Sequence, residues 1–341
     1  MTKTADRLQS LDVLRGIAAL GVAAFHYSTR YPELYPTAAP SPLRFQLGYY
    51  GVHLFFMISG AVILMSLEKS GGKGFVRSRF IRLYPVYWAS VLLTSAVLLA
   101  AEGRSAGLTW AQLLVNLTML EDYLKVAPVD GVYWSLSYEL GFYALMFAVF
   151  RTGLRRYVGL LPGILTLLSA SFIAAKPYLP HPLHYVLVFH AFSHLFAAGL
   201  AFFLIRSRGF RWDWAGVIAA APFIQLLHDG PAGFPPVALA VALMVWAILI
   251  SRPPPRWMAP LAWFGAISYA LYLTHQMIGY ALITKLESAG LSAGAAILAA
   301  IAVAIGIAAA LTYGVDEPAR RALKRHLLGA GDAVRPRTSR A

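Results

Sequence analysis

The sequence predicts an all-α fold: a polytopic integral membrane bundle of about ten transmembrane helices. Hydrophobic residues make up 59% of the 341 residues and charged residues only 13%, whereas a soluble domain carries roughly 25% charged residues. The apolar residues form long blocks, and about 20 apolar residues in a helix span a hydrocarbon core of ~30 Å. Because no water is available there to satisfy backbone N–H and C=O groups, each block must be helical.

Ten apolar blocks follow one another along the chain, separated by short polar loops. They are Leu11–Tyr27, Gly48–Leu67, Leu83–Ala101, Val132–Phe150, Val158–Ala175, Tyr185–Ile205, Trp214–Leu227, Val237–Ile250, Leu261–Ile283 and Ala293–Tyr313. The seventh and eighth are short for a full span, and segments of that length are often re-entrant or buried. Omitting both still leaves an even number, so both termini are expected on the same side.

The basic residues predict which side that is. The formal net charge of +14 first suggests a nucleic-acid partner, but its distribution argues against one. If successive loops alternate sides, the side with both termini holds 22 of the 29 Lys and Arg, the other side holds six, and Arg15 lies within a block. This is the positive-inside pattern, so both termini are expected in the cytoplasm and the chain in a bacterial inner membrane. The loop at 228–236 has no Lys or Arg between two basic loops, which favours two real crossings there.

The chain is interpreted as one transmembrane domain, residues 1–318, followed by a basic cytoplasmic tail, residues 319–341. The tail begins with Arg320–His326, which we expect to form a helix on the anionic inner leaflet. The chain has no cysteine, which excludes disulfides, thiolate catalysis and cysteine metal ligands. No A-x-A site follows the first block, so that block is interpreted as a retained anchor.

Charged residues at bilayer depth cost at least ~2.5–3.5 kcal/mol each and therefore indicate function. The first block carries Asp12, Arg15 and His26. Asp12 and Arg15 are three residues apart and are expected to form an ion pair. Arg15 and His26 are eleven residues apart, which returns to the same helix face ~16 Å further along, so both are expected in one groove. The alternative is that Arg15 reaches the interface and His26 ends the helix.

Polar residues of the next two segments are expected around the same cavity. In the second block, His53 faces either a cavity or a helix interface, and Ser59 and Gly60 allow neighbouring helices to approach closely. The following loop ends with Arg79 and Arg82, which are three residues apart. Two guanidiniums on one face suit bidentate phosphate contacts, whereas the simpler reading is ordinary positive-inside charge.

The fourth and ninth blocks add the remaining candidates. Trp134, Ser135 and Glu139 begin the fourth block, and Glu139 lies ~10 Å deep, at about the predicted level of His26. A carboxylate that orients an imidazole is the arrangement that general base catalysis uses, so His26 and Glu139 are predicted to pair. Tyr272 and His275 of the ninth block are expected to form a second polar wall.

The sixth block contains His190 and His194, four residues apart, a spacing that can bind zinc. No carboxylate or third ligand is evident nearby. We therefore expect no metal site there.

The order and spacing of these segments resemble the membrane acyltransferase-three family, which includes bacterial O-acetyltransferases of surface polysaccharides and exopolysaccharides, and macrolide acyltransferases. The resemblance spans nearly the whole chain and rests on LDVLRGIAALGVAAFH, GVHLFFMISG, RFIRLYPVYW, YWSLSYELGFY, FAAG, SYALYLTH and the closing DEP. This chain departs from many members at His53, where they have Asp, and at Glu139, Leu140 and Gly141, where many read E-E-Q. The extracytoplasmic hydrolase-like domain of some relatives is not expected here.

The resemblance implies an acyl-CoA donor, usually acetyl-CoA, bound from the cytoplasm, with no permanently bound cofactor. His26 matches the family's essential histidine and Arg15 its partner, while Arg79 and Arg82 match the pair thought to hold the donor phosphates. The implied partners are a glycan or glycolipid acceptor, the lipid bilayer and polysaccharide biosynthesis proteins. The alternatives are an acyltransferase for a macrolide or other small lipophilic acceptor and, from another class, a transporter or flippase. A transporter should show inverted repeats, and no matching halves are found.

Overall fold

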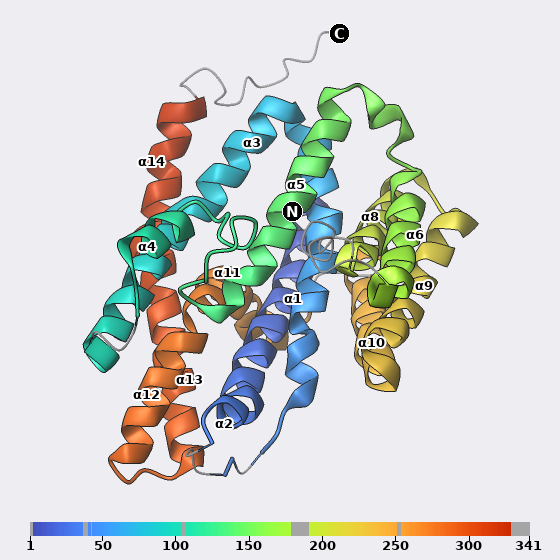
Figure 1. Cartoon of the computed structure of the whole chain (residues 1–341). Coiled ribbons are helices and arrows are strands. Elements are labelled where there is room, and N and C mark those ends of the chain that lie inside the picture. Colours follow the sequence, from blue (N-terminus) through green and yellow to red (C-terminus); the bar gives the residue numbers. More distant parts are fainter. Residues whose placement is uncertain are drawn as a thin grey trace.

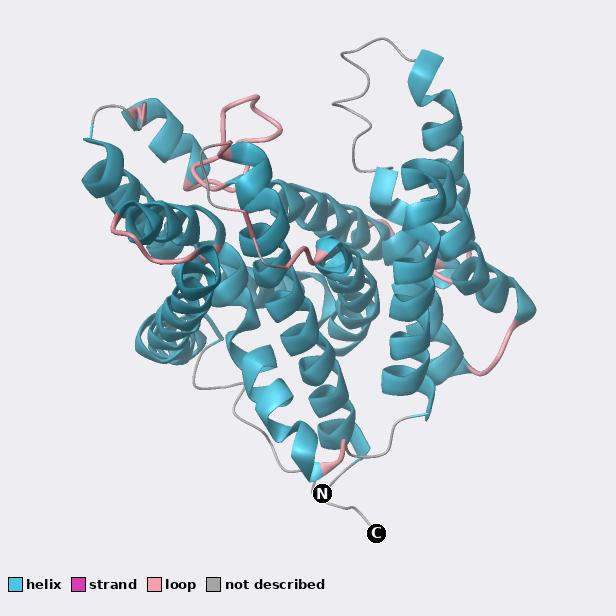
Figure 2. Ribbon diagram, turned by 90° about the horizontal axis from the view of Figure 1, so that it is seen from below, coloured by secondary structure: helices cyan, strands magenta, loops and turns pink. Residues whose placement is uncertain are grey.

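The computed structural model of the chain describes residues 3–36, 40–41, 43–103, 107–178, 191–250 and 254–328. Across these residues the regular structure is entirely helical (Figures 1 and 2), which confirms the predicted all-α class. The helices used below are α1 (Lys3–Phe25), α2 (Tyr31–Leu34), α3 (Gly51–Glu102), α4 (Trp110–Asn116), α5 (Trp134–Arg151), α6 (Leu161–Ala175), α8 (Ser193–Arg208), α9 (Trp212–Asp229), α10 (Phe234–Met244), α11 (Ala259–Thr274), α12 (Gln276–Ser288), α13 (Ala293–Leu311) and α14 (Glu317–Leu328).

The predicted number of ten spans is not confirmed. Four helical segments of the described chain are both long and apolar enough to cross a membrane: Gln46–Lys69, Gly74–Ala101, Trp212–Ile250 and Ala293–Leu323. Several other predicted blocks form helices of 13–16 residues, namely α6, α8, α11 and α12. In α1 and α5, charged and hydroxyl side chains interrupt the apolar sequence.

Two chain reversals depend on glycine. The second and third predicted blocks both lie in α3, which breaks at Gly71, where φ is +66°. The third long segment contains the seventh and eighth blocks, and it turns back at Gly230, where φ is +71°. Gly233 then lies against the carbonyl of Gln225, so α9 and α10 pack beside each other as a hairpin. A side chain disfavours positive φ, whereas glycine adopts it without cost.

Small residues bring the central helices together. Gly60 of α3 and Gly199 of α8 face each other so closely that a Cβ on either would collide with the backbone of the other helix. Gly16 of α1 and Gly265 of α11 form a second contact of this kind. This confirms the expected close approach at Gly60 and matches the small-residue packing of membrane helices. α8 is buried along Ser193–Leu204 and forms much of the core.

The ends of the helices separate by predicted side (Figure 1). The turn at Gly71, the upper ends of α5 and α14, and the connection from α5 to α6 lie at the top. α2 and the connection between α12 and α13 lie at the bottom. These two groups correspond to the loops expected in the cytoplasm and outside it. Which end faces the cytoplasm remains a prediction.

Candidate active site

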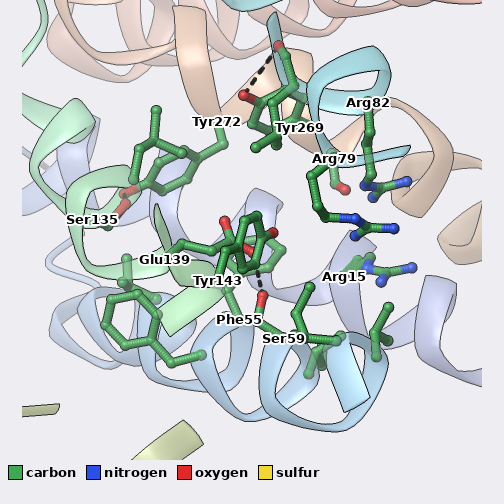
Figure 3. Close-up of a pocket in the computed structure, with 18 residues that line it drawn as sticks. Arg15, Phe55, Ser59, Arg79, Arg82, Ser135, Glu139, Tyr143, Tyr269 and Tyr272 are labelled. Carbon is green, nitrogen blue, oxygen red and sulfur yellow. Dashed lines mark hydrogen bonds between the residues drawn. The ribbon is translucent and has the colours of Figure 1, made fainter. Parts of the chain in front are cut away.

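The first polar cavity, here called the arginine cavity, lies among α1, α3, α5 and α11 (Figure 3). Its volume is about 80 Å³. Three guanidiniums and one carboxylate border it, together with hydroxyl and aromatic groups. Its polar lining consists of Arg15, Ser59, Arg79, Arg82, Ser135, Glu139, Tyr143, Ser268, Tyr269 and Tyr272.

The three arginines lie together at one side of this cavity (Figure 3). Arg15 forms the predicted ion pair with Asp12, with 2.8 Å between Nη1 and Oδ1, which confirms that prediction. Arg79 lies near the rings of Phe75 and Tyr143. Within the described residues Arg82 has no acidic partner at ion-pair distance. The surplus of guanidinium charge makes this side of the cavity suitable for an anion with several oxygens.

Glu139 is held in the arginine cavity and not beside His26. Ser59 Oγ and Tyr143 Oη both donate hydrogen bonds to Glu139 Oε1, the second at 2.5 Å. The predicted pairing of Glu139 with His26 is therefore not formed. Equal depth along two helices did not bring the side chains together, because the helices are rotated so that Glu139 points toward α3 and the arginines (Figure 3).

The second cavity, here called the histidine cavity, has a volume of about 700 Å³. His26 borders it at the point where α1 continues into the π-helical turn His26–Arg30. Such turns occur frequently at functional sites. Its other polar and aromatic lining residues are Phe25, Arg30, Glu33, Gln46, Tyr49, Tyr50, Trp134, Asp229, Tyr272 and Gln276.

His275 and the backbone carbonyl of Val22 determine which nitrogen of the His26 ring carries the proton. His275 Nδ1 lies 3.0 Å from the carbonyl oxygen of Leu271 and 2.9 Å from that of Tyr272. Carbonyl oxygens only accept, so His275 Nδ1 carries a proton and its Nε2 is an acceptor. His26 Nδ1 lies 3.1 Å from that Nε2 and 2.9 Å from the carbonyl oxygen of Val22. His26 Nδ1 must therefore be the donor, which leaves the Nε2 of a neutral His26 unprotonated.

A break between two helices places His275. α11 ends at Thr274 and α12 begins at Gln276, so His275 stands at the junction. Tyr27 Oη donates a 2.6 Å hydrogen bond to the His275 carbonyl, and the Met277 N–H donates to Asp130 Oδ2 at 3.1 Å. Tyr27 and Asp130 were not among the predicted site residues. Asp130 lies at the end of an acidic loop, just before the fourth block, and this position in the sequence could have indicated that it belongs to the site.

The two cavities meet at Val52 and Tyr272, which border both. Tyr272 Oη is hydrogen-bonded to Ser135 Oγ at 2.7 Å and to the Val132 carbonyl at 3.0 Å. Arg15 and His26, which were predicted to share one groove, therefore border two adjoining cavities. Ser59, Ser135 and Tyr272 line them as predicted, and Trp134 lines the histidine cavity.

Two further histidines lie away from these chambers. His53 is buried among Tyr49, Tyr50 and Phe192 and is not in the lining of either cavity. The Ser169 hydroxyl lies 2.9 Å from His194 Nδ1, and Gln225 Oε1 lies 3.1 Å from His194 Nε2, so both ring nitrogens have partners. His190 lies outside the described residues. Among the described residues no group of three or more potential ligands is arranged to hold a metal ion.

The fold and site define a helical protein with membrane-spanning segments, in which an arginine-lined cavity adjoins a cavity bordered by His26. The acyltransferase-three family, described as an acyltransferase domain, matches residues 8–313, and the chain belongs to this family of transferases. It is also similar to ORF330 of Acidianus two-tailed virus, whose name provisionally describes it as an acetyltransferase. The two are 24% identical over 277 residues, which cover 78% of this chain and 81% of the viral protein. No solved structure matches the chain.

Proposed function

We propose that this protein is an O-acyltransferase that moves an acyl group, most simply acetyl, from cytoplasmic acyl-CoA to a hydroxyl of an exported or cell-surface polysaccharide or its lipid-linked precursor. The observation that carries the proposal is the junction at Tyr272. On one side of it lie three guanidiniums, and on the other lies His26 with an unprotonated Nε2. A donor that is anionic at one end and reactive at the other fits such a pair of chambers.

The arginine cavity is proposed to hold the donor. Arg79 and Arg82 follow the break at Gly71, at the end of the bundle predicted to face the cytoplasm. Their guanidiniums suit the phosphate oxygens of coenzyme A, because Arg binds such groups through paired hydrogen bonds. The thioester would then extend past Tyr272 toward His26, ~16 Å along α1 from Arg15.

His26 is proposed to be the general base. Its Nε2 takes the proton of the acceptor hydroxyl, and the oxygen attacks the thioester carbonyl carbon. As the new C–O bond remains and the C–S bond breaks, the departing sulfur takes the proton back from His26, which leaves an ester and free coenzyme A. His275 Nε2 and the Val22 carbonyl, which both accept from His26 Nδ1–H, would stabilise the imidazolium in the role that a carboxylate often fills.

Acyl transfer should be tested directly with the purified protein in lipid nanodiscs, radiolabelled acetyl-CoA and a panel of glycans, with a macrolide as the alternative acceptor. We expect label in a glycan ester, and we expect His26→Ala to reduce the rate by roughly 10²–10⁴-fold while acetyl-CoA still binds. Normal turnover in folded His26→Ala would refute the proposed chemistry. Transfer to the macrolide alone would refute the glycan acceptor.

A further inference from the structure

One wall of the histidine cavity contains a carboxylate that the proposed chemistry does not use. Asp229, the last residue of α9, borders the cavity, and its side chain is 20% exposed. His228 Nδ1 lies 2.6 Å from Asp229 Oδ1, and Gln225 Nε2 donates to Asp229 Oδ2 at 2.7 Å. The hydroxyl of Tyr50 also interacts with this carboxylate. Asp229 is therefore held in one orientation at the cavity surface.

A directed chain of buried groups supports Asp229. Because the Gln225 amide nitrogen donates to Asp229, the Gln225 amide oxygen accepts, and it accepts from His194 Nε2. On the other side of the His194 ring, the Ser169 hydroxyl lies 2.9 Å from Nδ1 and also donates to the Ala191 carbonyl at 3.3 Å. Ser169, His194 and Gln225 are all fully buried. Buried polar networks are costly unless they are fully satisfied, and this one ends at a cavity-facing carboxylate.

Aromatic rings surround the same wall. Tyr49 and Tyr50 come from the turn before α3, with ring centroids 5.0 Å apart in an edge-to-face arrangement, and Trp134 begins α5. All three are partly exposed and border the cavity. A flat apolar ring face beside an orienting acceptor can bind a molecule that has an apolar face and hydroxyl donors at its edge. A pyranose ring has both.

The charge of the cavity indicates which sugars fit. Arg30 and Glu33 pair with each other at 3.1 Å, so neither charge dominates the opening. Asp229 leaves the lining with one surplus negative charge. That charge repels a uronic acid, whereas hydroxyl groups can donate to the remaining lone pairs of the carboxylate.

We infer that Asp229, Tyr49, Tyr50 and Trp134 form an acceptor subsite for a sugar ring that carries no carboxylate, with Asp229 accepting from its hydroxyls and the aromatic side chains stacking on it. The inference rests on the proposed function for its place beside His26. The cavity volume of about 700 Å³ lies within the roughly 300–1,000 Å³ of small-molecule sites. The cavity therefore has room for a sugar ring.

Equilibrium binding tests the subsite without depending on turnover. The full-length protein in nanodiscs should be titrated calorimetrically with neutral gluco-, galacto- and manno-configured trisaccharides and with trigalacturonate. We expect at least one neutral trisaccharide to bind more tightly than trigalacturonate. Asp229→Asn should weaken it by about tenfold or more, because it weakens hydrogen bonds to a charged acceptor. Tyr49→Ala should weaken binding clearly, and Tyr49→Phe much less.

Asp213→Asn is the matched control, because Asp213 stands at the opposite end of α9, exposed and paired with Arg211. It should bind the sugar as the wild type does, and every variant should retain acetyl-CoA binding. Tighter binding of trigalacturonate, no binding of any neutral trisaccharide, or unchanged binding in Asp229→Asn would overturn the subsite. Sugar binding without acyl transfer would instead refute the proposed function and leave the subsite supported.

Discussion

Replacing His275 tests whether His275 assists His26 in catalysis or is only a buried structural side chain. His275 Nε2 accepts from His26 Nδ1–H at 3.1 Å, so it stabilises His26 most when His26 becomes an imidazolium. A hydrogen bond to a charged group contributes about 1.5–3 kcal/mol, which corresponds to roughly 10- to 150-fold in rate. His275→Asn keeps an amide donor near the position of Nδ1 but is too short to reach His26, so kcat should fall by that factor.

His275→Gln provides the matched variant. Its amide oxygen reaches about the position of Nε2 and can accept from His26, so we expect it to recover most of kcat. The assay is acetyl transfer at saturating acetyl-CoA, expressed per folded molecule after size-exclusion chromatography. Trp214→Phe is the control for a buried hydrogen bond, because Trp214 is buried, donates to the Gly159 carbonyl and borders neither cavity. It should reduce yield and leave kcat per folded molecule unchanged.

The same dyad predicts non-additive losses. Residues that act as one unit lose little more together than singly, so His26→Ala combined with His275→Asn should be about as slow as His26→Ala alone. If the double variant loses the product of the two single effects, the residues act independently. A kcat of folded His275→Asn within about twofold of wild type would also refute the dyad, since that corresponds to less than about 0.5 kcal/mol.

Three further predictions follow from the other parts of the molecule. Replacing Arg79 and Arg82 together by Gln should raise KM for acetyl-CoA with little change in kcat. An unchanged KM in well-folded protein would mean that the two arginines only determine membrane orientation and do not bind the donor. Reporter fusions at Met1 and Ala341 should both score as cytoplasmic, and an extracytoplasmic score at either would reverse the assignment of sides. In the loop before α5, burial raises the pKa of Glu121 from 4.5 to about 7, so the folded state keeps a proton that the unfolded state releases between these values. The free energy of unfolding should therefore fall between pH 4.5 and 7 by up to roughly 3 kcal/mol. In Glu121→Gln this decline should be smaller, and an equal decline would contradict the assignment to Glu121.

The sequence determined the properties that depend on short-range order. Long apolar blocks required helices because the bilayer offers backbone groups no other partner. The i,i+3 spacing was enough to pair Asp12 with Arg15, and it placed Arg79 and Arg82 on one face that lines the same cavity. The motifs also identified the family, which the match over residues 8–313 confirms.

Only the tertiary structure decided which deep polar groups meet. Glu139 accepts a hydrogen bond from Ser59, although the two are 80 residues apart in the sequence. His26 and His275 are hydrogen-bonded across a separation of 249 residues. Helical periodicity fixes the face and depth of a side chain on its own helix, but the rotation of each helix against its neighbours depends on packing across the bundle. Here close glycine contacts join α3 to α8 at Gly60 and Gly199, and α1 to α11 at Gly16 and Gly265. For this reason His26 and Glu139, predicted as partners from equal depth, border two separate chambers that meet at Tyr272.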